Sequence, residues 1–237
     1  KARTIKAAIL KRMGRHEEAN ELCVESLKLD KFNYGCLFIS GNTHTLVELM
    51  HGSAHNYDET ALEFCAAGLW SEAEAIWDIA IKSGATTPMT YYYRGWCQLQ
   101  AGNAQAAQKT FAEGAACCPH MVFPNRAEAI LALRAALNIN PGDANANHYL
   151  GNLFYDKRQY DLASAYWERA AELNPSYPTT WRNLALYYFN KAGNQQKALD
   201  AMERAFFLDE TDSRVLMELD QLYKKLQRPH SERLTFL

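Results

Sequence analysis

One arrangement of small and bulky residues recurs along the chain. An alanine is followed four positions later by a large apolar residue and three positions later again by a small one, as in Ala163, Trp167 and Ala170. Positions i, i+4 and i+7 form one stripe of an α-helix, and small residues beside a large one let a second helix approach closely. The pattern predicts helices that pack tightly against a neighbour. Further copies begin at Ala73, Ala107, Ala129 and Ala198.

A second apolar stripe precedes four of these copies and predicts the partner helix. Its residue at the closest approach of the two helices is small in every case: Ala61, Gly95, Gly151 and Ala185. A larger side chain there would push the helix axes apart. Proline follows three copies and is expected to end the helix. The predicted unit is an αα-hairpin of about 34 residues.

These motifs resemble the tetratricopeptide repeat (TPR) family. The stretch 144–177 carries a Leu-Gly pair at Leu150 and Gly151, then Phe154, the alanine and tryptophan of the stripe, and a closing Pro175. The stretch 178–212 has the family's tryptophan at Trp181. The resemblance implies an all-α fold, an α-solenoid of stacked antiparallel helical hairpins that follows a right-handed superhelix.

The repeat period breaks once, near the middle of the chain. Residues 126–138 predict a single helix of the second type with no first helix before it, and Pro124 is expected to begin it. We therefore predict an N-terminal stack over 1–119, an irregular seam over 120–143 and a C-terminal stack over 144–237, packed together as one continuous solenoid.

Charge and hydropathy narrow the expected partners and location. The 237 residues include 25 Lys and Arg against 27 Asp and Glu, a net charge of −2 that gives no field for nucleic acid. The longest apolar stretches are too short to span a membrane. Six cysteines without a paired spacing favour reduced thiols. We expect a soluble, cytoplasmic fragment of a longer protein, whose targeting signal could lie outside this sequence.

The sequence offers no standard catalytic signature. It has no phosphate-binding glycine loop, nucleophile elbow or dinucleotide fingerprint, so we expect this fragment not to be an enzyme and to need no cofactor. Activity of the full-length protein stays open. His44, His51 and His55 would share a face of one long helix, but Gly52 is expected to end that helix, which argues against a metal site. Carboxylate pairs such as Asp58 and Glu59 are expected on solvated faces.

Polar residues on the predicted first helices of the C-terminal stack form a candidate binding strip. Asn152, Asn183 and Arg214 are separated by about one repeat and should lie on successive first helices, with His148 one turn before Asn152. Arg182 adds a cation suited to a carboxylate or phosphate. The alternative is that Asn183 bridges neighbouring helices through its amide and that Arg214 is only solvated.

The TPR resemblance gives one argument for a binding role of this strip and one argument against it. In the family's peptide-terminus clamp, a lysine and an asparagine lie on one first helix, an asparagine on the next, and two cations on the third. His148, Asn152, Asn183 and Arg214 match four of these places, with histidine in place of lysine. Glu218 takes the fifth place, where it would repel a carboxylate.

In the N-terminal stack, aromatic residues suggest a second contact area. Tyr91 is assigned to the core by its repeat position, whereas Tyr92 and Trp96 share a face expected to look into the groove. Such rings could stack on a peptide side chain or a sugar, or could pack between stacks.

We therefore interpret the chain as a non-catalytic scaffold module that binds a protein or peptide segment, or its own upstream domain, through a concave groove. The C-terminal half also resembles repeat arrays behind a mutarotase-like β-sandwich domain in bacterial proteins of unknown function. That resemblance implies an alternative, a helical accessory domain that completes a carbohydrate-active site. Homodimerisation through the helix over 213–225 is a third hypothesis.

Overall fold

The computed structural model describes residues 1–234, and all regular structure within that range is helical. The predicted all-α class of antiparallel helical hairpins is therefore confirmed. The chain divides into two compact units, Lys1–Val122 and the residues from Phe123 onwards. The division falls inside the predicted seam. Residues 235–237 of the predicted C-terminal stack lie outside the described residues.

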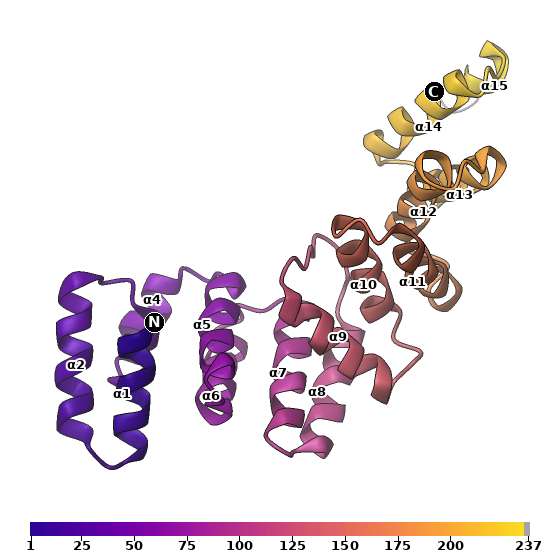
Figure 1. Cartoon of the computed structure of the whole chain (residues 1–237). Helices are drawn as coiled ribbons and strands as arrows, with labels where there is room; N and C mark the ends of the chain where they lie inside the picture. Colours follow the sequence, from indigo (N-terminus) through magenta and orange to yellow (C-terminus); the bar gives the residue numbers. More distant parts are fainter. Residues whose placement is uncertain (235–237) are drawn as a thin grey trace. The chain divides into compact units, whose positions relative to one another are not determined.

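The first unit contains three long hairpins and one short helix pair, which Figure 1 shows in indigo to magenta. Within each long hairpin the two helices pack directly on each other, and α7 contacts both α5 and α6. The short pair α3–α4 continues from α2, which contacts α3. The helices are α1 (Ala2–Arg12), α2 (His16–Leu29), α3 (Tyr34–Ile39), α4 (Thr43–Met50), α5 (Ala54–Ala66), α6 (Trp70–Lys82), α7 (Pro88–Gln100) and α8 (Ala104–Ala116).

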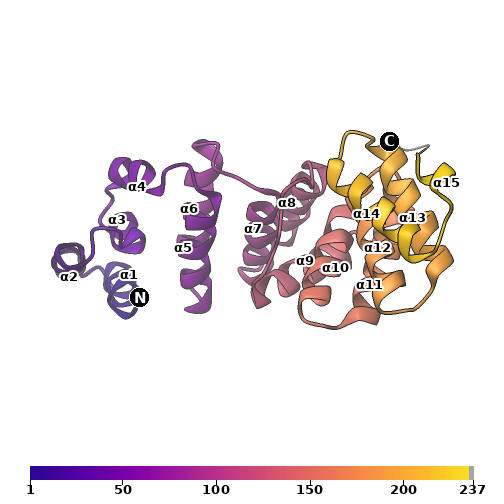
Figure 2. The ribbon, with the colours of Figure 1, turned by 90° about the horizontal axis from the view of Figure 1, so that it is seen from above.

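The second unit begins with the single helix α9, which packs on α10, and continues with two hairpins and a terminal helix pair (Figure 2). Each hairpin contacts the next through its second helix: α11 packs on α12, and α13 on α14. The helices are α9 (Ala127–Ile139), α10 (Ala144–Asp156), α11 (Tyr160–Leu173), α12 (Pro178–Asn190), α13 (Gln195–Leu208), α14 (Ser213–Lys225) and α15 (His230–Leu234).

The core of each hairpin is built by the two predicted stripes. In α10–α11, Gly151 lies under the ring of Trp167, so close that a Cβ on Gly151 would stand 2.3 Å from Trp167 Cδ1. In α7–α8, a Cβ on Gly95 would stand 2.6 Å from Phe111 Cε1. Both aromatic residues are buried. The small residue at the crossing is therefore a steric requirement of the large one opposite, as the sequence predicts.

One helix start differs from the prediction. The single helix α9 begins at Ala127, so the expectation that Pro124 begins it is wrong. Arg126 before it is extended, with φ −90° and ψ 152°, and its guanidinium binds Glu128 in the first turn. The seam thus enters the helix through extended backbone.

The cysteines and the helix lengths also bear on the sequence expectations. All six cysteines are free, and Cys23, Cys36, Cys65 and Cys97 are buried as small apolar residues, as predicted. Across the described residues, no helix combines the length and apolar character needed to cross a membrane.

Candidate binding surface

The predicted strip lies on the first helices of the second unit, and local sequence sets where each of these helices starts. The side chain of Asp143 caps α10 by accepting from the backbone N–H of Ala146 at 2.9 Å. Pro178 stands in the first turn of α12, where the missing N–H costs nothing. The side chain of Asp212 caps α14 by accepting from Arg214 and Val215. These starts fix which side chains of neighbouring first helices meet.

A chain of hydrogen bonds joins α10 to α11 and α12 through Asn152. Trp167 can only donate, and its Nε1–H lies 3.0 Å from Asn152 Oδ1. That bond orients the amide, so Asn152 Nδ2 donates to His148 Nε2 at 3.0 Å. His148 therefore carries its proton on Nδ1 and donates it to Thr180 Oγ1 at 2.9 Å. The imidazole is neutral, and both of its nitrogens are occupied.

The environment of His148 favours this neutral form. Its side chain is buried, and burial lowers its pKa to about 4 because a buried imidazolium would lose its hydration. A second ring proton on Nε2 would also point at the N–H of Asn152. His148 is therefore a structural hydrogen-bonding residue and is not an exposed ligand, which corrects its predicted orientation.

The network continues from Asn152 to the other predicted residues. Asn183 Nδ2 donates to Asn152 Oδ1 at 3.0 Å, which links α12 to α10. Arg182 forms a bidentate ion pair with Glu218 of α14, at 2.6 Å from Nε and 2.5 Å from Nη2. Arg214 Nε reaches the same carboxylate at 3.2 Å. The structure therefore places these predicted residues together, and their polar groups pair with one another.

Exposure separates the members of this strip. The side chains of Arg182 and Glu218 are 14% and 16% exposed, whereas Arg214 is 69% exposed. Asn183 bridges helices through its amide, which was the alternative interpretation of this residue. Arg214 is the strip residue with the most freedom to meet a partner.

The aromatic pair of the first unit is placed differently from its prediction. Tyr92 is fully buried, with its ring 6.4 Å from that of Phe111, so the expectation that it looks into an open groove is wrong. The physical reason is that Tyr92 lies on the side of α7 that packs on α8, where its ring meets Phe111. Trp96 is half-buried, and its ring meets Trp70 edge to face at 6.0 Å.

A second buried polar group escaped the sequence interpretation. Asp58 was expected on a solvated face, but it is buried and accepts from Trp77 Nε1 at 2.9 Å. Burial raises the pKa of Asp58 to about 7, although hydrogen bonds from Trp77 and Thr90 oppose the shift. A detectable signal exists: Asp58 precedes Thr90 by the same spacing, 32 residues, that separates His148 from its bonded Thr180.

The histidine cluster does not form a metal site. Helix α4 ends at Met50, and His51 follows in the left-handed conformation with φ 51°. Ser53 then caps α5, so the continuous helix needed to align the three histidines does not exist. Among the side chains that the structure describes, no group of three or more His, Cys, Asp or Glu is placed to hold a metal ion.

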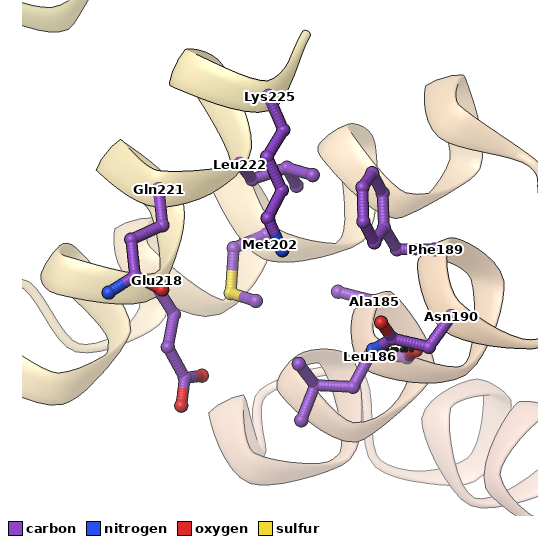
Figure 3. A pocket seen from close by; sticks show the side chains of 9 residues that line it. All are labelled: Ala185, Leu186, Phe189, Asn190, Met202, Glu218, Gln221, Leu222 and Lys225. Carbon is purple, nitrogen blue, oxygen red and sulfur yellow. Dashed lines mark hydrogen bonds between the residues drawn. The ribbon is translucent and has the colours of Figure 1, made fainter.

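An apolar pocket opens between the first helices α12 and α14, next to the strip (Figure 3). We call it the α12–α14 pocket. Its volume is about 170 Å³, and Met202 of α13 contributes to its wall. The lining residues are Ala185, Leu186, Phe189, Asn190, Met202, Glu218, Gln221, Leu222 and Lys225. The sequence interpretation missed this pocket. Its signal was the presence of two large apolar residues, Leu186 and Phe189, at positions that the hairpin core does not use.

Paired helices of about this length, with a small residue at each crossing and a large one opposite, define a helical-repeat protein. The chain belongs to the tetratricopeptide repeat family, whose sequence model matches residues 59–121 and 148–212, together more than half of the chain. Such a fold is consistent with an interaction scaffold, since repeat arrays present extended binding surfaces.

Several solved structures are also similar to the chain. YrrB, described as a TPR protein with an unusual peptide-binding site, is 16% identical over 90% of this chain and 87% of its own, with a TM-score of 0.37. A structure of MamA 41-end from Desulfovibrio magneticus RS-1 is 17% identical over 77% and 90%, with a TM-score of 0.43. A further MamA crystal structure is 17% identical over 88% and 96%, with a TM-score of 0.37.

Proposed function

We propose that the chain is a non-catalytic interaction module that binds a protein or peptide segment, or another domain of its own protein, on the first-helix face of the second unit. The observation that carries the proposal is the α12–α14 pocket. It presents half-buried Leu186 and Phe189 between two neighbouring first helices. Apolar anchors that enter such pockets supply most of the energy of protein recognition.

The polar strip supports a scaffold role more than a chemical one. A general base needs a free lone pair near a reacting group. His148 has both ring nitrogens hydrogen-bonded, and Glu218 is held by Arg182 and Arg214. These groups instead connect α10, α12 and α14, so they fix the spacing of the helices that form the pocket. In this proposal the strip holds the first helices in position, and the partner binds in the pocket between them.

A peptide-display selection tests this function. The native chain is panned against random dodecapeptides in parallel with a Gln221→Trp variant, whose indole would cover the pocket mouth from an exposed position. We expect sequences that are enriched on the native chain and lost on the variant. Enrichment that is equal on both proteins, or absent from both, would contradict the proposal.

The carbohydrate alternative remains a separate hypothesis. Its discriminating measurement is binding of the chain to a glycan array, with competition by peptides selected on the pocket. Glycan binding that survives Gln221→Trp would favour an accessory role in a carbohydrate-active protein over recognition of a protein segment.

A further inference from the structure

We infer that the α12–α14 pocket selects an acidic segment carrying one aliphatic or phenyl side chain. This inference rests on the proposed function and adds the chemistry of the partner. It is drawn from three features of the surface: the size of the pocket, the apolar character of its walls, and the charges around its mouth.

The pocket has room for a single side chain. Its volume is about 170 Å³, and an apolar cavity of about 150 Å³ is large enough to hold benzene. Ala185, Met202 and Leu222 are buried and give it an apolar base, while Leu186 and Phe189 form its more open wall. One leucine, isoleucine or phenylalanine would fill this space and displace its water.

The charges around the mouth are unequal. Glu218 is the carboxylate that lines the pocket, and it already binds the guanidinium groups of Arg182 and Arg214. Lys225 lines the same pocket, with its Nζ 5.0 Å from the centre of the Phe189 ring (Figure 3). Arg182 neutralises Glu218 through its bidentate pair, so the exposed Arg214 and Lys225 leave an excess of positive charge near the pocket.

The positions of these cations suit carboxylates on both sides of an anchor. Lys225 and Glu218 lie seven residues apart on α14, about two helical turns, so Lys225 lies at one end of the pocket and the arginine pair at the other. Arg214 is exposed and can exchange part of its contact with Glu218 for a partner carboxylate. An apolar residue flanked by acidic residues matches this order, whereas a basic segment would be repelled.

The test uses three synthetic nonapeptides and fluorescence anisotropy with the full chain. The first contains one leucine flanked on each side by two aspartates, the second replaces the aspartates with lysines, and the third replaces the leucine with serine. We expect the first to bind roughly tenfold or more tightly than either of the others, with an affinity that falls as salt is raised.

Variants assign the charge preference to the pocket. Lys225→Glu should weaken the aspartate peptide roughly tenfold and improve the lysine peptide. Lys109→Glu, on exposed α8 surface of the first unit, makes the same change in net charge and should leave both affinities unchanged. Circular dichroism of each variant confirms that the helices are retained.

The outcomes separate this inference from the proposed function. Pocket-dependent binders without acidic flanks, or a Lys225→Glu variant with unchanged preference, would overturn the acidic chemistry and leave the interaction module standing. A display selection with no pocket-dependent binder would overturn the module itself, and the acidic inference with it.

Discussion

Replacement of Gly151 by alanine tests the packing rule on which the hairpins are built. The new methyl group would lie 2.3 Å from Trp167 Cδ1 and 2.4 Å from Trp167 Nε1, closer than atoms in real structures approach. The indole cannot move away freely, because its Nε1–H donates to Asn152 at 3.0 Å. The substitution therefore forces a choice between a steric clash and loss of that hydrogen bond.

The expected cost follows from three opposing contributions. Overpacking of a filled core destabilises by about 1 to 3 kcal/mol, and loss of the bond to Asn152 by about 1 kcal/mol. Alanine stabilises a helix by about 0.5 to 1 kcal/mol relative to glycine. Steric conflict wins, and we expect Gly151→Ala to lower the free energy of unfolding by about 2 kcal/mol.

Urea unfolding followed by circular dichroism measures this change. Gly142→Ala is the matched control, since Gly142 is exposed and a Cβ there would meet only the side chain of Asn140 at 3.2 Å. Its effect should stay within about 0.5 kcal/mol. Gly95→Ala, opposite the phenyl ring of Phe111, should show the overpacking cost alone. A Gly151→Ala protein as stable as the native chain would refute the reasoning.

Three further predictions concern the buried polar groups. The pKa of His148 is lowered to about 4 in the folded chain, so the unfolded chain binds the extra proton below pH 6.5 and stability falls by at most about 3 kcal/mol down to pH 4. His148→Gln should remove this loss in urea titrations between those pH values. The pKa of Asp58 is raised to about 7, so its contribution is complete below pH 3.8 and disappears as pH rises to 7. Asp58→Asn should keep the Trp77 bond and raise the melting temperature at pH 7.5, and an unchanged melting temperature would contradict the assignment. Glu218→Gln should cost about 1 to 3 kcal/mol because it leaves the half-buried Arg182 without its ion pair. Glu18→Gln, in an exposed ion pair, should leave the melting temperature nearly unchanged in the same thermal assay.

The hairpins were predictable because their determinants are local. The spacing of Ala163 and Trp167 defines a helix face, and Gly151 on the preceding helix marks the crossing. The structure confirms the close approach at this residue. Pro124 misled because proline is compatible both with a first helical turn and with extended backbone. No local pattern distinguishes the two, and the helix begins only at Ala127.

The sequence predicted which residues of the candidate strip lie close together, but not what their side chains contact. Repeat spacing placed Asn152 and Asn183 on neighbouring first helices, and they bond at 3.0 Å. Whether such side chains face a partner or each other depends on groups from other helices, such as Trp167 and Glu218. Sequence spacing predicts the helix face on which a residue lies, but it says little about which groups from other helices contact that residue.

The burial of single aromatic or charged residues was the feature that the sequence predicted least well. Tyr92 is buried because its ring packs on Phe111 of the facing helix. Asp58 is buried because Trp77 supplies a donor from the next helix. In both cases the decisive group lies about twenty residues away in sequence, beyond the reach of a pattern read along one helix.

The corresponding places of Asp58 and His148 give the two units opposite responses to acid. Each stands 32 residues before a threonine, but one is an acid that burial keeps protonated and the other a base that burial keeps unprotonated. Through these two groups alone, mild acidification favours the folded first unit and disfavours the folded second unit. Lowering the pH from neutral to about 5 should therefore reduce the stability of the second unit relative to that of the first.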